Sequence, residues 1–473
     1  MSSSKDILAN SGVKFGTSGA RGLVEQFTDQ VCSAFTLAFV GVMKKSFEFD
    51  RIAIAIDRRP SSPEMAAACA SALTEIGLRV DYYGIIPTPA LALKSMQDGI
   101  PSIMITGSHI PFDRNGIKFY RPDGEIEKSD ELAILESDAK VVTCSKVQLQ
   151  ELSRAKELYI ERYTKLFSPD LFAGKRIGVY EHSAAGRDVN VSVLKALGAE
   201  VISLGRTETF VPIDTEAVSA EDQQQALEWS NQHDLDCILS TDGDGDRPLV
   251  ADENGRWLRG DILGLLCAKS LEVNALAVPV SCNTAIDKSG AFDVVRKTRI
   301  GSPYVIEAMK ELAERFERVG GFEANGGFML QSDLQFNGFT LKALPTRDAL
   351  LPALIVMAEA FGGGGAISKL VSRLPARYTA SDRLKEFPTE KSKGLIAEWA
   401  KDLGQLSFLL SLNAEIVEVD MTDGVRVCLA NENVIHLRPS GNAPEFRCYA
   451  EAETEEGARY LVEEALKAMR SCL

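Results

Sequence analysis

The sequence predicts three tandem α/β domains with mixed sheets, followed by an α+β domain with an antiparallel sheet. Three observations lead to this prediction. At 473 residues the chain is too long for one ordinary core, and its length favours roughly three or four domains. Strand-like and helix-like segments alternate through the first three quarters, as in βαβ units. The last hundred residues instead contain closely spaced strand patterns before one long helix.

The first block alternates as expected for a sheet covered by helices. We expect strands over 51–57, 78–83 and 102–106, helices over 63–76 and 89–96, and a hairpin over 117–126. The hairpin is predicted to turn at Pro122-Asp123-Gly124, because proline and glycine favour turns. A charged helix over 152–166 then leads into the second block.

The second and third blocks repeat the pattern. In the second, we expect strands over 176–180, 200–204 and 235–241, and a helix over 188–197 that stops at Gly198. In the third, we expect a helix over 261–271, a strand over 276–280, a helix over 302–316, a strand over 319–323 and one long apolar helix over 345–361. The run of four glycines that follows, 362–365, is predicted to be a flexible connector.

The C-terminal segment is predicted to be a separate α+β domain. Its strand patterns cover 414–419, 424–429, 434–438 and 445–451, and its helix covers 455–469. We expect a tether over 368–383 to join it to the third block. The predicted domains are therefore 1–152, 153–257, 258–371 and 372–473.

Composition narrows the class of protein. A hydrophobic content of 45% and a charged content of 25% are typical of a soluble globular protein. The formal net charge of −15 argues against nucleic acid or an anionic membrane as a partner. No signal-peptide pattern or spanning segment is visible, and the nine scattered cysteines favour a reducing compartment. We therefore expect a cytoplasmic monomer or dimer whose partner is a small molecule.

The most informative motif is Asp242-Gly-Asp244-Gly-Asp246-Arg247, directly after the apolar segment 235–241. If that segment is a strand, alternate positions share a face, and the three carboxylates converge. Such a cluster favours a hard cation, and Mg²⁺ takes oxygen ligands that it often shares with phosphate. An EF-hand loop would need glycine where Arg247 stands, and it would need flanking helices. A plain solvated turn remains the alternative.

A second motif is Thr106-Gly-Ser108-His109-Ile-Pro111, which follows another apolar strand. Ser108 would stand at a strand's carboxyl end, where α/β folds bind their ligands. Serine is a weak nucleophile unless a base or a metal activates it, and His109 and Lys118 are close in sequence. By itself the motif also fits a structural turn.

The motifs together resemble the α-D-phosphohexomutase family over essentially the whole chain. In chain order they are Gly16-Thr-Ser-Gly-Ala-Arg21-Gly22, Ser108-His109, the acidic triad with Arg247, Glu323 and Arg438-Pro-Ser-Gly441. The family contains phosphomannomutases and phosphoglucomutases. The resemblance implies four domains around a central cleft and a Mg²⁺-dependent mutase that moves a phosphoryl group between O6 and O1 of a hexose. It also implies a phosphoserine, and a hexose 1,6-bisphosphate that serves as intermediate and activator.

The resemblance implies a role for each matching residue. Ser108 is the expected phosphoserine, and it shares metal binding with Asp242, Asp244 and Asp246. The other expected catalytic residues are His109, Lys118, Arg21 and Arg247. The expected sugar-binding residues are Glu323, Asn325, Thr298 and Gly301. The expected residues for the non-reacting phosphate are Arg438, Ser440, Gly441, Asn442 and Arg447.

Three positions depart from the family's usual pattern. Ile110 stands where asparagine is usual, and Asn442-Ala443-Pro444 replaces Thr-Glu-Pro. The sugar loop reads Glu323-Ala-Asn325-Gly-Gly327, whereas the family often has Glu-x-Ser-Gly-His. An amide still donates hydrogen bonds to phosphate, so we expect the phosphate loop to work. The lost histidine leaves the preferred hexose open.

Within the family we favour a phosphomannomutase. A phosphoglucomutase, a dual-specificity mutase and a phosphoglucosamine mutase are the alternatives. From other classes, the candidates are a Mg²⁺-dependent sugar phosphatase that uses the same phosphoserine and a non-catalytic sugar-phosphate binder. The second phosphate loop favours the mutase, because a phosphatase has little use for it.

Two further features are weaker signals. The histidines at 182, 233 and 436 have no partner at ligand spacing and are not expected to bind a metal. The basic run Arg296-Lys297-Thr298-Arg299 is either part of the sugar-selecting surface or an exposed turn.

Overall fold

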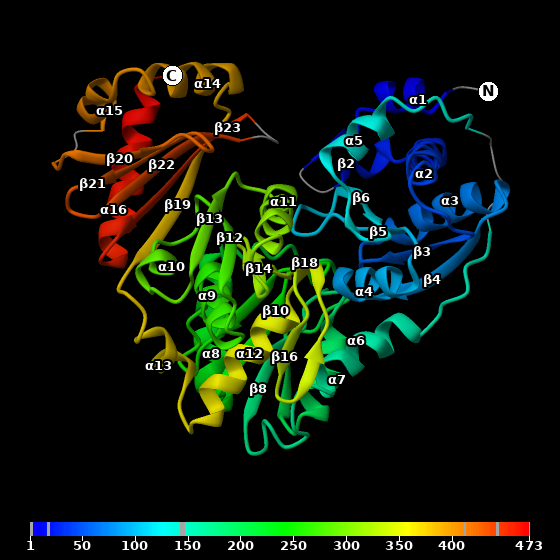
Figure 1. Ribbon diagram of the computed structural model, residues 1–473, viewed down its shortest axis with the longest axis horizontal. Helices are drawn as coiled ribbons and strands as arrows, with labels where there is room; N and C mark the ends of the chain where they lie inside the picture. Colours follow the sequence, from blue (N-terminus) through cyan, green and yellow to red (C-terminus); the bar gives the residue numbers. More distant parts are fainter. Residues whose placement is uncertain (1–2, 17–18, 142–146, 411–412, 441–443, 473) are drawn as a thin grey trace.

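The computed structural model describes residues 3–16, 19–141, 147–410, 413–440 and 444–472. Four larger sheets and one two-stranded hairpin organise this part of the chain. The units built around the four larger sheets are called domains I to IV here, in chain order. Figure 1 shows domain I (blue to cyan) and domain IV (orange to red) on opposite sides, with domains II and III between and below them.

Domain I is a mixed sheet of strand order β1-β2-β6-β5-β3-β4, with β7 paired to β6. β3 runs parallel to β4 and β5, whereas β6 runs antiparallel to β5. The strands are β1 (Lys14–Phe15), β2 (Ala20–Leu23), β3 (Arg51–Ile56), β4 (Arg79–Ile85), β5 (Ser102–Ile105), β6 (Arg114–Arg121) and β7 (Gly124–Glu125). The helices are α1 (Ser4–Asn10), η1 (Val24–Gln26), α2 (Asp29–Met43), α3 (Ser62–Glu75), α4 (Thr88–Asp98) and α5 (Lys128–Leu135), and α6 (Arg154–Thr164) leads into domain II.

Domain II has the strand order β11-β10-β8-β9. Of its three parallel strands, β8 and β10 are buried, which explains their apolar sequences, whereas the edge strand β9 is partly exposed. The strands are β8 (Arg176–Tyr180), β9 (Glu200–Leu204), β10 (Cys237–Thr241) and the antiparallel β11 (Pro248–Ala251). The helices are α7 (Arg187–Ala196) and α8 (Ala220–His233).

Domain III has the strand order β13-β12-β14-β15-β18. The strands are β12 (Ala275–Pro279), β13 (Val294–Thr298), β14 (Val319–Phe322), β15 (Phe328–Leu330) and β18 (Leu344–Asp348), with the hairpin β16 (Leu334–Phe336) and β17 (Phe339–Leu341). The helices are α9 (Gly260–Ser270), α10 (Ala285–Lys288), α11 (Ser302–Ala313), α12 (Leu350–Gly362) and α13 (Ile367–Val371).

The single helix predicted over 345–361 is wrong at its start, because the segment to Asp348 is a strand. The Asp348 carboxylate accepts hydrogen bonds from the backbone N–H groups of Leu350 and Leu351, at 3.0 and 3.4 Å. It therefore caps α12 and fixes where the helix begins.

Domain IV is an antiparallel sheet of order β19-β23-β22-β21-β20. The strands are β19 (Tyr378–Lys385), β20 (Ile416–Asp420), β21 (Val425–Leu429), β22 (Val434–Pro439) and β23 (Glu445–Ala452). The helices are α14 (Thr389–Trp399), α15 (Leu403–Leu409) and α16 (Glu455–Arg470). The tether predicted over 368–383 is therefore shorter, because β19 begins at Tyr378 and pairs with β23 along its whole length.

The apolar cores show how the domains are joined. One cluster of buried side chains includes Ala53 of domain I, Leu239 of domain II and Leu354 of domain III. The core of domain IV is a separate cluster, which includes Leu406 and Met469. None of the described helices is both long and apolar enough to cross a membrane.

Candidate active site

Ser108 stands in a tight turn after β5 that a buried ion pair holds in place. Its φ is +52°, in the left-handed region that few residues other than glycine adopt. Arg59, from the loop after β3, donates to the carbonyl oxygens of Ser108 and Ile110 at 3.0 and 2.6 Å, and to those of Pro111 and of Arg114 at the start of β6. Its Nε donates to Asp57 at 3.1 Å, and both side chains are fully buried. This pair fixes the backbone that presents Ser108.

The acidic triad lies on the turn between β10 and β11. The expectation that strand alternation aligns the carboxylates is wrong, because β10 ends at Thr241. The turn, in which Gly245 has a φ of +72°, gathers the three carboxylates instead. One oxygen from each of Asp242, Asp244 and Asp246 lies within 4.8 Å of the other two, and all three side chains are buried.

Domains I and II meet at Ser108 and the triad. The Ser108 hydroxyl donates to Asp242 Oδ2 at 2.6 Å. The two loops approach so closely that a Cβ at Gly243 would lie 2.7 Å from the Ser108 carbonyl oxygen. Glycine is therefore required at this position of the turn.

Cations and a hydroxyl surround the triad. Lys118 on β6 donates to Asp244 and Asp246 at 2.5 and 2.7 Å, and Thr88 donates to Asp244 at 2.7 Å. Arg347 on β18 donates from Nε to Asp246 Oδ2 at 3.1 Å. Ion pairs between Lys118 of domain I and the triad of domain II thus join these two domains, and Arg347 of domain III adds another.

Burial and mutual repulsion shift the pKa values of the three triad carboxylates in different directions. Burial raises the pKa of Asp242 well above its ordinary value, and Asp244 and Asp246 raise it further. Burial also acts to raise the pKa of Asp244, but Lys118 outweighs it and the pKa falls. For Asp246, burial is outweighed mainly by Arg347 and Lys118, so the pKa is lowered too. The repulsion therefore favours protonation of Asp242, the carboxylate that contacts Ser108.

His109 is a neutral side chain among arginines. Burial, Arg247 and Arg21 lower its pKa to about 2. Arg247 Nη1 lies 2.8 Å from His109 Nδ1, and a guanidinium can only donate, so Nδ1 is the acceptor and the ring proton is on Nε2. Burial, with Arg247 and Arg347 nearby, lowers the pKa of Arg21 to about 10. This crowding of positive charge suits a phosphoryl group.

The sugar loop follows β14 and is buried. The side-chain oxygen of Asn325 accepts from the Gly327 N–H at 3.0 Å. The backbone carbonyl of Asn325 accepts from the Thr215 hydroxyl at 3.1 Å. Glu323 Oε2 accepts from Arg347 Nη1 at 3.0 Å. The same arginine thus contacts both the expected sugar loop (323–327) and the turn that carries the triad (242–247), which is called the metal loop below.

Thr298 and Gly301 lie at the same carboxyl edge of the domain III sheet as the loop after β14, two strands away from it. Thr298 ends β13, and its hydroxyl donates to the Arg299 carbonyl at 2.8 Å. Gly301 precedes α11 with a φ of +133°. Residues 296–298 belong to a strand. The alternative prediction of an exposed turn is therefore wrong for these three residues. Between the two, the Ile300 N–H donates to Asp423 of domain IV at 3.1 Å.

The expected phosphate loop belongs to domain IV. Arg438 and Arg447 are cross-strand partners at the adjoining ends of β22 and β23. Arg438 Nε lies 3.7 Å from Asp423 Oδ2, and the Ser440 N–H donates to the Glu445 carbonyl at 2.9 Å. The other two expected residues, Gly441 and Asn442, lie outside the described residues.

Four family models of the phosphoglucomutase/phosphomannomutase group match the chain in tandem. They describe α/β/α domain I over 12–141, α/β/α domain II over 157–255, α/β/α domain III over 259–378 and the C-terminal domain over 377–468. The chain belongs to this family.

Curated relatives and solved structures agree with this membership. A phosphomannomutase of Salmonella muenchen is 54% identical over 99% of this chain and 98% of its own. A phosphomannomutase of Sinorhizobium fredii is 42% identical over 98% of this chain and 100% of its own. A structure described as a phosphomannomutase from Thermus thermophilus has a TM-score of 0.78 at 20% identity, over 97% of this chain and 99% of its own. An N-acetylphosphoglucosamine mutase of Aspergillus fumigatus, in complex with GlcNAc-6P and magnesium, has a TM-score of 0.57 at 13% identity, over 100% of this chain and 99% of its own.

The donor set of this phosphohexomutase fits a divalent cation. Three carboxylates converge, and Asp244 Oδ1 and Asp246 Oδ1 are buried without a hydrogen-bond partner among the described atoms. Buried carboxylate oxygens are costly to leave unpaired, and a hard cation would satisfy them. The Ser108 hydroxyl is close enough to the triad to join the set.

Sequence reasoning missed three important residues of the phosphohexomutase site: Asp57, Arg59 and Arg347. The first two follow β3 directly, and charged residues at the carboxyl end of a predicted strand were a usable signal. Arg347 stood inside a segment predicted to be helix, so its position gave no such signal.

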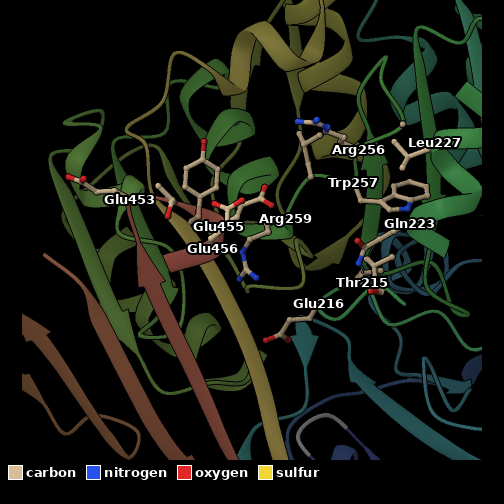
Figure 2. A pocket seen from close by; sticks show the side chains of 15 residues that line it. Thr215, Glu216, Gln223, Leu227, Arg256, Trp257, Arg259, Glu453, Glu455 and Glu456 are labelled. Carbon is tan, nitrogen blue, oxygen red and sulfur yellow. Dashed lines mark hydrogen bonds between the residues drawn. The ribbon is translucent and has the colours of Figure 1, made fainter. Parts of the chain in front are cut away.

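A cleft of about 800 Å³ is lined by none of these three residues. It opens between domain II and domain IV, and its lining includes Thr215, Trp257, Arg259, Tyr378 and Glu456. Figure 2 shows Glu455 and Glu456 beside Arg259, with Trp257 and Gln223 on the other side. None of the expected catalytic or metal-binding residues lines it.

Proposed function

We propose that the protein is a phosphomannomutase that interconverts mannose 6-phosphate and mannose 1-phosphate. The observation that carries the proposal is the 2.6 Å contact between the Ser108 hydroxyl and Asp242 of the acidic triad, in a chain of this family. The preference for mannose is supported by the two phosphomannomutases that are 54% and 42% identical.

In the proposed reaction, Ser108 carries the phosphoryl group. A sugar hydroxyl attacks phosphorus, and the bond from phosphorus to Ser108 Oγ breaks. We propose that the hydroxyl proton passes to Lys118 in its neutral amine form, freed from the ion pairs that its ammonium makes here with Asp244 and Asp246. Arg21 and Arg247 would hold the phosphoryl oxygens, because charge-assisted hydrogen bonds favour the charge that they carry in transfer. The bisphosphate then turns over and returns its other phosphoryl group to Ser108. A Mg²⁺ ion held by the triad would neutralise part of the transferring charge.

The remaining assignments concern binding. Glu323, Asn325, Thr298 and Gly301 would contact the sugar ring, and Arg438, Ser440, Gly441, Asn442 and Arg447 would hold the phosphate that does not react. His109, neutral and with Nδ1 engaged by Arg247, would donate from Nε2. A hexose phosphate is therefore the proposed partner, and its 1,6-bisphosphate the proposed activator.

Coupled assays with mannose, glucose and glucosamine 6-phosphates, each primed with the matching 1,6-bisphosphate, test this function. We expect the highest kcat/KM with mannose 6-phosphate. A higher value with glucose 6-phosphate would make the enzyme a phosphoglucomutase. Release of inorganic phosphate without any sugar 1-phosphate would make it a phosphatase.

A further inference from the structure

Arg347 connects two loops that belong to different domains. Its side chain is 2% exposed. Nε and Nη2 each lie 3.1 Å from Asp246 Oδ2 of the metal loop, and Nη1 donates to Glu323 Oε2 of the sugar loop at 3.0 Å. A guanidinium is a planar fork of donors, so it can hold both carboxylates at a fixed separation, whereas a lysine ammonium is a single point of charge.

The sugar loop is shaped to admit this arginine. A Cβ at Gly327 would lie 2.7 Å from Cγ, 2.8 Å from Cδ and 2.9 Å from Cβ of Arg347. The stem of Arg347 therefore fills the space that a side chain at 327 would need. This is the position at which the sequence lacks the histidine common in related sugar loops, so the missing side chain and the arginine are parts of one arrangement.

The positive charge of the Arg347 guanidinium is also matched by the carboxylates around it. Burial acts to lower the pKa of Arg347, but Asp246, Glu125 and Glu323 raise it well above its ordinary value. The guanidinium is thus charged at neutral pH. A buried ion pair is stable only when its geometry is good, and removing one partner leaves uncompensated charge.

We propose that Arg347 is a positioning residue that fixes Glu323, the sugar-binding carboxylate, relative to Asp246 of the metal loop. The inference rests on the proposed function, because it takes Glu323 as the group that grips the sugar. Arg347 sets where that carboxylate stands when the ring is oriented for phosphoryl transfer.

The proposal makes opposite predictions for sugar and metal. In Arg347→Met, Glu323 loses its anchor, so sugar-phosphate binding weakens. The same change removes a positive charge beside Asp246, so the triad becomes more negative and binds a cation at least as well. In Arg347→Lys, the charge remains but the fork is lost, so only sugar binding weakens. General damage to the fold would weaken both.

Calorimetric titration of the full-length, unphosphorylated protein tests this directly. The probes are MgCl₂ alone, and mannose 6-phosphate or glucose 6-phosphate in the presence of Mg²⁺. We expect both Arg347 variants to raise the sugar-phosphate Kd about tenfold or more, with no increase in the Mg²⁺ Kd. The matched control is Arg187→Met, which removes another buried arginine, one that binds backbone carbonyls of domain II. It should lower the melting temperature and leave both Kd values unchanged.

Gly327→Ala provides a second test that keeps the arginine. Its added methyl group should displace the Arg347 stem and raise the sugar-phosphate Kd as Arg347→Met does. In an Arg347→Ala background the contacts with Cγ and Cδ are gone and only the 2.9 Å contact with Cβ remains, so Gly327→Ala should raise the Kd less than it does beside the arginine. Full additivity of the two changes would contradict the shared arrangement.

Two results would overturn the inference. One is an unchanged sugar-phosphate Kd in Arg347→Met and Arg347→Lys. The other is parallel weakening of sugar and Mg²⁺ binding in both variants, which would show that Arg347 only supports the fold. These titrations do not need turnover. If the protein bound mannose 6-phosphate without isomerising it, the proposed function would be contradicted, but the comparison of sugar-phosphate and Mg²⁺ Kd values would still test the role of Arg347. If the unsubstituted protein bound neither sugar phosphate, both would fail.

Discussion

The first three domains and the C-terminal domain are attached to their neighbours in different ways. A single apolar cluster runs through domains I, II and III, whereas domain IV has a core of its own. Its contacts to domain III include hydrogen bonds from Asn283 to Arg377 and from Thr284 to Glu451. Polar contacts exchange with water at little cost, and a continuous apolar core does not. We therefore expect domains I to III to move as one body and domain IV to move against it.

This difference matches the division of the site. Ser108 and the triad face each other across the rigid part, where positions must be held within a fraction of an ångström. Arg438 and Arg447 lie on the part expected to move, so a distal phosphate held by them, as we propose, would close the site over an intermediate. Figure 1 shows domain IV joined to the rest through the segment that leads from α13 to β19.

The largest expected effect comes from the rigid part. Ser108→Ala should abolish turnover, with a loss of about 10⁴-fold or more, because no other group can carry the phosphoryl. The melting temperature should change little, since only one hydrogen bond is lost. Steady-state assay and thermal melting measure both. Ser203→Ala, an exposed serine on β9, is the matched control, and near-normal activity in Ser108→Ala would contradict the assignment.

Removal of the metal should have the next largest effect. Treatment with EDTA followed by desalting should lower kcat about 10²-fold or more, because the transferring charge then lacks its neutralising cation. Added Mg²⁺ should restore the activity, and Ca²⁺ should restore less of it, because Ca²⁺ favours longer bonds and more ligands. Full activity after chelation, with metal content checked by mass spectrometry, would remove the triad from the reaction.

A substitution in the movable part should affect binding more than chemistry. Arg438→Ala should raise the KM for the sugar phosphate about 10- to 100-fold, as expected for a lost charge-assisted contact. The change in kcat should be smaller, and the melting temperature should stay within a few degrees. Arg459→Ala, an exposed arginine on α16, is the control. An unchanged KM in Arg438→Ala would take the distal phosphate away from this loop.

The smallest effect on chemistry should come from two matched core substitutions. Leu354 and Leu406 are both 0% exposed, one in the shared core and one in domain IV. Each change to alanine should cost about 2–5 kcal/mol of stability. In differential scanning calorimetry, Leu354→Ala should lower the transition of domains I to III, and Leu406→Ala only that of domain IV. Equal shifts of a single transition in both variants would show that domain IV does not unfold separately.

Much of the fold could be predicted because its central strands are short buried apolar runs. The bounds of β8, a buried central strand, agree with those expected from sequence, and so do those of the edge strand β9. α8 was not foreseen, because only Ala226 and Ser230 of its residues are buried and no apolar stripe marks it. The helix predicted over 345–361 was wrong at its start because an Asp348 cap and a strand were read as part of the apolar run.

The parts of the site that consist of consecutive residues could be predicted from sequence. The parts that depend on contacts between residues far apart in the chain could not. The acidic run and the Ser-His pair each mark a strand's carboxyl end, and the structure brings them together. Arg347 is 101 positions from Asp246 and 24 from Glu323, and no spacing rule connects them. The buried pair of Asp57 and Arg59 supports Ser108 from another strand, which only the sheet order β5-β3 reveals.

The central claim is that one phosphoryl group resides on Ser108 and passes from it to a sugar. Incubation with mannose 1,6-bisphosphate and Mg²⁺, followed by intact-mass and peptide mass spectrometry, tests this most directly. We predict a gain of one phosphoryl mass on the peptide that contains Ser108, and its loss when mannose 6-phosphate is added, with bisphosphate formed in equal amount. A protein that stays unmodified at Ser108 while it still isomerises mannose 6-phosphate would contradict the account.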